Sequence, residues 1–218
     1  MRIKKASVLI VDDHPLFRER LCQLINGEPD LQVCGEAETA QEAVQHAIAA
    51  RPDLVILDIT LKGSSGLELT KTLRALSMNL PILVLSMHDE SLYAERVLRA
   101  GATGYITKNE SSGEVLLAVR RVLAGQVYVS AKMNSILLRN VAGAGSRTSA
   151  RPIDRLTDRE FEVLELIGQG QTTRAIAEAL KVGIATVDTY RARIKEKMKF
   201  RNGIELQHFA IRWVRERE

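Results

Sequence analysis

Cysteine is scarce in this chain: among its 218 residues the cysteines are Cys22 and Cys34. Two cysteines are too few for the disulfide framework of a small secreted domain or for a zinc knuckle. Both lie in stretches that we predict to be helix or strand, so we expect buried free thiols. Such thiols suit a reducing cytoplasm, which is where we expect the protein to act.

Long apolar runs are also absent. The first run, Ala6–Val11, is stopped by Asp12 and is too short for the core of a signal peptide. No stretch is long enough to cross a membrane, so we expect no membrane partner. Hydrophobic residues still make up 45% of the chain and charged residues 27%, which is typical of globular proteins and leaves room for two modest domains.

Positive and negative charge are unevenly divided along the chain. Residues 1–129 hold 14 lysines and arginines against 16 acidic residues, whereas residues 130–218 hold 17 against 11. The resulting net charges of −2 and +6 suggest that only the second part meets a polyanion. A solvated basic face would give the same numbers, so the charge does not decide between the two.

The first part of the chain alternates short apolar runs with helical patterns. The predicted strands are 8–11, 31–35, 54–58, 82–86 and 104–107, and the predicted helices are about 15–25, 40–48, 66–77, 91–99 and 113–124. This alternation predicts an α/β fold with a doubly wound, five-stranded parallel sheet of the flavodoxin type.

Side chains of complementary chemistry follow the predicted strands at their carboxyl ends, which share one edge of a parallel sheet. They are Asp12 and Asp13, Asp58, Ser86 and Lys108. A lone Asp58 would be explained as the cap of its strand. Crowded carboxylates, however, repel one another unless a cation joins them, and oxygen ligands suit Mg²⁺. A lysine and a hydroxyl suit phosphoryl oxygens, so we predict a phosphoryl-binding site in which one carboxylate is the acceptor.

Residues 5–129 resemble the receiver domain of bacterial two-component response regulators. The resemblance is carried by Val11-Asp12-Asp13-His14, Leu57-Asp58, Leu85-Ser86, Gly101-Ala102, Tyr105 and Lys108, in this order and spacing. We interpret His14 as an exposed residue at the start of the first helix and not as a metal ligand.

The resemblance implies a role for each residue of the site. Asp58 would accept a phosphoryl group from a sensor histidine kinase. Lys108 would pair with the phosphoryl oxygens, Ser86 would move to hydrogen-bond them, and Tyr105 would change rotamer behind Ser86. The implied ligands of Mg²⁺ are Asp12, Asp13, Asp58 and the backbone carbonyl of Thr60.

A phosphatase is the alternative from another class of protein. Haloacid-dehalogenase-like phosphatases also use an aspartate nucleophile after a buried strand, and they place a second aspartate two residues later as the general acid. Thr60 occupies that position here. Because the pair of carboxylates needed for acid–base chemistry is missing, we expect a phosphoacceptor with at most weak self-catalysed phosphotransfer and dephosphorylation, and not an enzyme.

A connecting region is expected at residues 130–152. Its first part, 130–141, has helical spacing, and its second part, 142–152, is small and polar like a flexible linker. Residues 153–218 then form a small all-α domain. Thr157 and Glu160 predict a capping box, Thr172 predicts a second cap, and a tight turn at 181–184 precedes a helix at 185–198. A last helix is expected at about 204–213.

Two short helices joined by a tight turn, the second of them basic on its outer side, favour a helix-turn-helix. Any small helical bundle with a solvated basic face shares this pattern. The stretch also resembles the LuxR-type DNA-binding domain, through Leu156-Thr157-Asp158-Arg159-Glu160, Val163-Leu164, Gly170, Ile176-Ala177, Leu180, Thr186-Val187 and Tyr190. A receiver followed by a LuxR-type domain is similar to the NarL/FixJ subfamily over nearly the whole chain.

This second resemblance implies a homodimer that binds double-stranded DNA, with the last helix in the dimer contact. Asp188 lies where relatives often carry lysine, and an acidic side chain can accept a hydrogen bond from cytosine. Gly183 replaces the usual serine cap of the recognition helix. The expected DNA-binding residues are Thr186, Asp188, Thr189, Arg191, Arg193 and Lys195.

The preferred hypothesis is therefore a phosphorylation-switched transcription factor. A third interpretation remains, in which the receiver is an interaction module that works without phosphorylation. The complete set of Asp12, Asp13, Asp58, Ser86 and Lys108 argues against it.

Overall fold

The computed structural model describes residues 5–61, 64–87, 90–141 and 152–216. The chain divides into two compact units, Met1–Ser146 and Arg147–Glu218. The predicted flexible linker lies outside the described residues except for Pro152. Within the described ranges, no helix is both long and apolar enough to cross a membrane.

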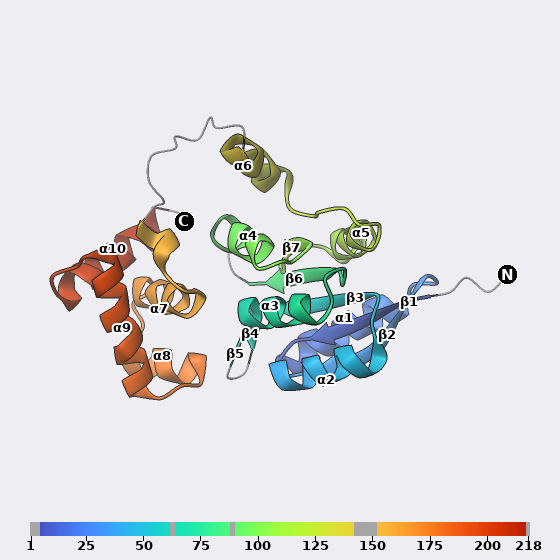
Figure 1. The fold of residues 1–218 in the computed structure, drawn as a ribbon, viewed down its shortest axis with the longest axis horizontal. Coiled ribbons are helices and arrows are strands. Elements are labelled where there is room, and N and C mark those ends of the chain that lie inside the picture. Colours follow the sequence, from blue (N-terminus) through green and yellow to red (C-terminus); the bar gives the residue numbers. More distant parts are fainter. Residues whose placement is uncertain (1–4, 62–63, 88–89, 142–151, 217–218) are drawn as a thin grey trace. The chain divides into compact units, whose positions relative to one another are not determined.

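A five-stranded parallel sheet forms the centre of the first unit (Figure 1), with the order β2-β1-β3-β6-β7. The strands are β1 (Ala6–Val11), β2 (Leu31–Ala37), β3 (Leu54–Asp58), β6 (Ile82–Ser86) and β7 (Gly104–Thr107). The central strand β3 is buried along its whole length because the sheet is covered on both faces, which explains its continuous apolar run. The predicted doubly wound parallel sheet is confirmed.

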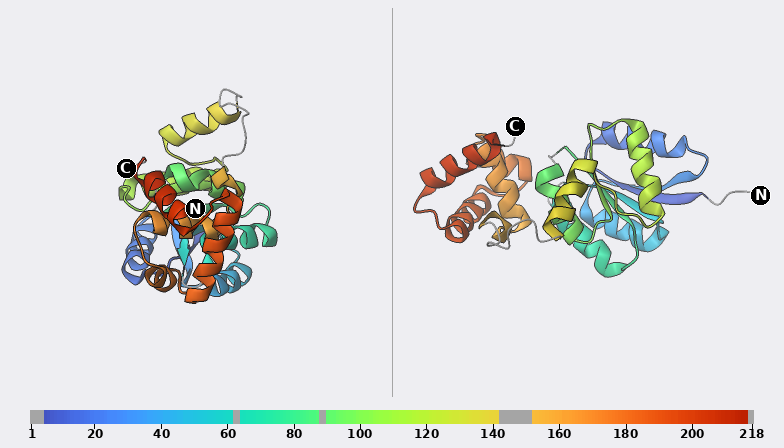
Figure 2. Two further views of the ribbon diagram at one scale, coloured as in Figure 1. Left: turned by 90° about the vertical axis from the view of Figure 1, so that its left-hand side faces the viewer. Right: turned by 90° about the horizontal axis from the view of Figure 1, so that it is seen from above.

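Helices cover the two faces of this sheet (Figure 2). On one face α1 (Pro15–Asn26) and α5 (Ser112–Leu123) enclose a core in which Ile25 and Val119 join Ile56 of β3. The other helices of the sheet are α2 (Ala40–Ala50), α3 (Gly66–Leu76) and α4 (Glu90–Arg99). Side-chain caps begin several of them, because a hydroxyl satisfies a backbone N–H that lacks a helical partner. These caps are Thr39 before α2, Ser65 before α3 and Ser111 before α5.

Four side chains are less buried than we predicted. Leu16 and Ile48 belong to the apolar stripes of the first two helices, yet they are 83% and 59% exposed. A helical stripe read from spacing alone is wider than the strip that the sheet covers. Cys22 and Cys34 are free but only half-buried.

Two short features of the first unit were not predicted. The stretch after β3 includes the antiparallel pair β4 (Thr60–Leu61) and β5 (Ser64–Ser65). After α5, the chain returns along β7, where Tyr128 forms a bridge with Gly104. We call residues 126–130 the edge segment, and the predicted helix that follows it is α6 (Ala131–Val141).

The second unit is entirely helical among its described residues. It consists of the 3-10 helix η1 (Pro152–Arg155) followed by α7 (Asp158–Gly168), α8 (Thr173–Leu180), α9 (Ile184–Met198) and α10 (Gly203–Arg215). The capping box of Thr157 and Glu160 is confirmed, as is the cap at Thr172. Gly183 precedes α9 without a side-chain cap. A tight connection from α8 to α9 gives the predicted helix-turn-helix.

Candidate functional site

Asp58, the last residue of β3, lies at the centre of the candidate site. Its side chain is 3% exposed, and its Oδ2 lies 2.7 Å from the Nζ of Lys108. Its Oδ1 accepts a hydrogen bond of 3.2 Å from the backbone N–H of Thr60. The strand order reverses between β1 and β3, and open α/β sheets bind ligands at such a switch point.

Asp12 and Asp13 follow β1 and reach the same position. Val11 is in register with Leu57, so the residues after them are neighbours at the sheet edge. The Nζ of Lys108 lies 2.7 Å from Asp12 Oδ2, the same distance as from Asp58. Lys108 thus bridges two buried carboxylates, which offsets part of their mutual repulsion.

The carboxyl group of Asp58 is costly to ionise at this place. Burial has the largest effect and raises the pKa of Asp58. The Lys108 ammonium lowers this pKa and the Asp12 carboxylate raises it, and the net value is about 6. One ligand atom from each of Asp12, Asp13, His14 and Asp58 lies within 4.8 Å of the others. Three carboxylates so close together form a donor set of hard oxygens that fits Mg²⁺.

His14 lies nearer to these carboxylates than the sequence suggests. Its side chain is 63% exposed, as predicted, but its ring Nδ1 lies 3.0 Å from Asp13 Oδ1. Its backbone N–H donates to Asp12 Oδ1 at 2.8 Å. The backbone conformation at the start of α1 decides this approach, and sequence spacing carries no signal for it.

Two further side chains near the site were also missed. The ring of Phe17 lies under the ammonium of Lys108, with 4.5 Å between the Nζ and the ring centroid. Arg18 donates a hydrogen bond to the backbone carbonyl of Asp12. Both side chains come from the first turns of α1. Their positions after Asp13 are visible in the sequence, but their partners are not.

Ser86 ends β6, the neighbour of β3, and Tyr105 lies on β7, the next strand at the edge of the sheet. Both side chains are fully buried. The carbonyl of Ser86 accepts a hydrogen bond of 2.8 Å from the backbone N–H of Lys108, so the two residues are fixed at one edge. Thr60 is exposed beyond β3, and its backbone carbonyl stays a predicted ligand.

The predicted DNA-contacting residues lie on α9 of the second unit. Val187 and Ile194 are buried and attach the helix to its own unit. Of the predicted residues, Thr186, Asp188, Thr189 and Arg193 are exposed, while Arg191 and Lys195 are half-buried. The Nη1 of Arg191 donates to the hydroxyl of Thr173 on α8 at 3.4 Å. Exposed polar groups on one helix suit a recognition surface.

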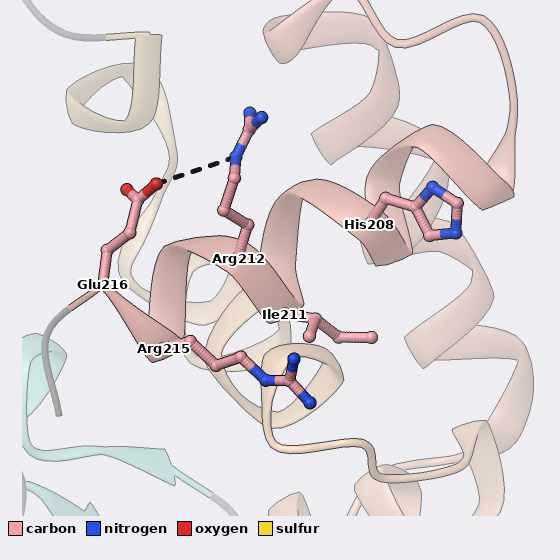
Figure 3. A pocket seen from close by; sticks show the side chains of 5 residues that line it. All are labelled: His208, Ile211, Arg212, Arg215 and Glu216. Carbon is pink, nitrogen blue, oxygen red and sulfur yellow. Dashed lines mark ion pairs between the residues drawn. The ribbon is translucent and has the colours of Figure 1, made fainter.

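A second face of this unit is formed by α10. Figure 3 shows the side chains that line a shallow cavity of about 300 Å³ on this helix, namely His208, Ile211, Arg212, Arg215 and Glu216. Arg212 and Glu216 form an ion pair of 3.9 Å across one turn. Ile204, at the start of the helix, is 65% exposed.

An acidic cluster with a lysine at the edge of a parallel sheet, together with a helix-turn-helix unit, is the combination found in regulators that couple a receiver to DNA binding. The family model for the response regulator receiver domain matches residues 8–120. The model for bacterial regulatory proteins of the luxR family matches residues 154–210. The chain therefore belongs to the NarL/FixJ-type response regulators of two-component systems.

Similar proteins agree with this assignment along almost the whole chain. A putative transcriptional regulator of Pseudomonas aeruginosa is 37% identical over 95% of this chain and 98% of its own length. The nitrate/nitrite response regulator NarL of Escherichia coli is 32% identical over 96% of this chain and 94% of its own. The structure of RcsB from Salmonella enterica serovar Typhimurium, bound to promoter rprA with the phosphomimetic BeF3-, is alike in fold. Its TM-score is 0.62 at 23% identity, covering 95% of this chain and 98% of that one.

Proposed function

We propose that this response regulator accepts a phosphoryl group on Asp58 from a sensor histidine kinase and, as a homodimer, binds double-stranded DNA to regulate transcription. The observation that carries the proposal is the buried Asp58 carboxylate, which shares the ammonium of Lys108 with Asp12. A location in the cytoplasm follows from the proposed DNA target. The proposed domains are the receiver at 5–129, the connecting region at 130–152 and the DNA-binding domain at 153–218.

Phosphoryl transfer requires little covalent chemistry from the protein. A carboxylate oxygen of Asp58 attacks the phosphorus of the phosphohistidine, an O–P bond forms as the P–N bond breaks, and the electron pair stays on the imidazole nitrogen. Lys108 then exchanges its contact with Asp58 for the phosphoryl oxygens. Asp12, Asp13, Asp58 and the Thr60 carbonyl would hold Mg²⁺, which would supply positive charge to the transferred group.

The output is proposed to pass through Ser86 and Tyr105. Ser86 hydrogen-bonds the phosphoryl group, and Tyr105 takes up the space that Ser86 leaves. On DNA, we assign Arg191, Arg193 and Lys195 to the phosphate backbone and Asp188 and Thr189 to base edges, with Thr186 beside them at the start of α9. The exposed Ile204 and half-buried Ile211 support α10 as the dimer contact.

Phosphotransfer with purified kinase, or with a small phosphodonor, tests the acceptor. Asp58→Asn should abolish labelling. Asp53→Asn is the matched control. Asp53 is an exposed aspartate directly before β3, and its carboxylate accepts hydrogen bonds from the backbone N–H and the hydroxyl of Ser7 on β1. Undiminished labelling of Asp58→Asn would contradict the proposal.

Two further measurements separate the alternatives. A genome-wide DNA pull-down with and without beryllofluoride should recover specific sites more efficiently with it, whereas equal recovery would favour a receiver that works without phosphorylation. Multiple turnover on phosphate esters would instead point to a phosphohydrolase. Thr60 argues against that activity, since no carboxylate follows Asp58 at the position of the general acid.

A further inference from the structure

Arg18, on α1, ties the loop that carries Asp12 to the end of strand β2. Its Nη1 donates to the backbone carbonyl of Asp12 at 2.7 Å. Its Nε donates to Glu36 at 3.1 Å and its Nη2 to Glu38 at 2.7 Å. The Arg18 side chain is 13% exposed, whereas its partners Glu36 and Glu38 are 51% and 42% exposed.

The bond from Arg18 completes the fixation of Asp12. The backbone N–H of Asp12 donates to the carbonyl of Ala37 at 3.0 Å. Its Oδ1 accepts from the N–H of His14, and its Oδ2 contacts Lys108. With Arg18 on the carbonyl, both peptide groups and the carboxylate of Asp12 have hydrogen-bond or ion-pair partners.

We propose that Arg18 is a positioning residue for the divalent cation, an inference that rests on the proposed function. It acts through Asp12, which it holds at the spacing that the cation requires. Its effect is geometric: Arg18 with Glu36 and Glu38 carries a net negative charge, so the group adds no positive charge to the site. Groups that orient metal ligands from outside typically change metal affinity by about 10- to 100-fold when they are removed.

If the role of Arg18 is geometric, lysine cannot replace arginine at this position. A guanidinium can donate in three directions from one plane, whereas an ammonium on a flexible stem is a point charge. Arg18→Lys therefore keeps the charge and loses the fork. If the fork is what positions Asp12, lysine should not replace arginine.

Magnesium binding to the full-length protein, measured by calorimetry, tests the proposal. We expect the Kd for Mg²⁺ to rise roughly tenfold in Arg18→Met, with Arg18→Lys close to Arg18→Met. The matched control is Arg120→Met, because Arg120 on α5 also joins two acidic residues, Glu28 and Asp30, away from the site. Its Kd should stay that of the unmodified protein. An unchanged Kd in Arg18→Met, or full rescue by Arg18→Lys, would overturn the proposal.

A second readout requires no metal. Hydrogen exchange of the His14 amide in EDTA reports whether the loop is held, because this amide donates to Asp12 Oδ1. We expect faster exchange in Arg18→Met than in Arg120→Met, and equal protection would contradict the role of Arg18. If the unmodified protein bound no Mg²⁺, the proposed metal site would fail, while the exchange result would still decide whether Arg18 holds the loop.

Discussion

At the scale of single residues, the site consists of charges that burial makes expensive. Asp58 and Asp12 are almost fully buried and share one ammonium. The polar residues of the site can be identified in the sequence, because each follows a predicted strand: Asp12 and Asp13, Asp58, Ser86 and Lys108. The contacts of His14, Phe17 and Arg18 are not, because they depend on how the start of α1 is oriented over the sheet edge.

The raised pKa of Asp58 predicts a pH-dependent cost to stability without metal. Burial raises this pKa from 3.8 to about 6. Above pH 6, ionised Asp58 therefore lowers the free energy of unfolding by the full amount of this shift. The loss of stability disappears as the pH falls from 6 toward 3.8. In EDTA, Asp58→Asn should therefore be more stable than the unmodified protein at pH 7.5, by roughly 1–3 kcal/mol.

Thermal unfolding at several pH values checks this prediction. The advantage of Asp58→Asn should shrink steadily from pH 7.5 to pH 4, and saturating Mg²⁺ should reduce it at pH 7.5. Asp53→Asn should show no gain in stability at pH 7.5, because the exposed Asp53 carboxylate accepts hydrogen bonds from Ser7. An advantage that did not depend on pH would mean that ionisation of Asp58 is not its cause.

At the scale of elements, two contacts hold strands and helices in their functional positions. In the first unit, the edge segment forms a bridge beside β7, where the N–H of Tyr105 donates to the carbonyl of Tyr128 at 2.8 Å. In the second unit, the Nζ of Lys197 on α9 lies 2.6 Å from Glu160, which also caps α7. Neither contact follows from local sequence signals, since each joins residues far apart in the chain.

Gly104→Ala should displace the edge segment from β7. A Cβ at this position would lie 2.9 Å from the carbonyl oxygen of Tyr128 and 3.0 Å from the side chain of Leu83. The backbone oxygen cannot yield as a flexible side chain can, and overpacking of this kind typically costs about 1–3 kcal/mol. We expect the Tyr105 amide to lose protection in hydrogen exchange.

Gly113→Ala is the control for this substitution. Gly113 lies in α5, and a Cβ there meets only the hydroxyl of Ser111 at 3.8 Å. Alanine should stabilise the helix by about 0.5–1 kcal/mol. Retained protection of Tyr105 in Gly104→Ala would show that the bridge tolerates a side chain.

Glu160→Gln should loosen α9 from α7. Burial disfavours the charged carboxylate, but the hydrogen bonds from Lys197 and the Thr157 backbone outweigh it and lower the pKa of Glu160 below 4.5. Its stabilisation is thus present above pH 4.5 and is lost as the pH falls through the lowered pKa. Glutamine keeps an acceptor for the cap but loses the charge, so we expect a loss of about 1–2 kcal/mol at neutral pH.

Fluorescence of Trp213 provides the measurement, because it is the single tryptophan of the chain and packs edge-on against Phe161 of α7. Acid unfolding followed by this signal should be less steep in Glu160→Gln. Glu178→Gln, which breaks an exposed pair with Arg174, should be nearly neutral. Equal behaviour of the two variants would show that the ion pair of Glu160 with Lys197 does not hold α9 against α7.

At the scale of the whole molecule, charge separates an input unit from an output unit. Residues 1–146 hold 16 lysines and arginines and 16 acidic residues, whereas residues 147–218 hold 15 and 11, a net charge of +4. The acidic cluster lies in the first unit and the exposed polar face of α9 in the second. The division into units agrees with a chain in which one part receives a phosphoryl group and the other meets a polyanion.

Arg193→Ala should weaken DNA binding without changing which sequences are preferred. Arg193 is an exposed cation on α9, and a phosphate contact releases about one counterion. The affinity should fall for specific and nonspecific DNA alike, and the slope of log K against log salt should become shallower by about two for the dimer, one for each protomer. Fluorescence anisotropy at several salt concentrations measures both quantities.

Arg120→Ala, in the receiver, is the control and should leave the salt slope unchanged. A loss confined to one DNA sequence would instead assign Arg193 to base recognition. Such a result would revise the proposed division between backbone and base contacts on α9.

The sequence by itself determined the order of strands and helices, the caps at Thr157 and Thr172, and the acidic, hydroxyl and lysine residues at the strand ends. These follow from local periodicity and from the rule that parallel strands share a carboxyl edge. Only the tertiary structure decided the exposure of Leu16, the edge segment beside β7 and the fork of Arg18. Such features depend on which surfaces meet across the fold, and local spacing carries no information about that.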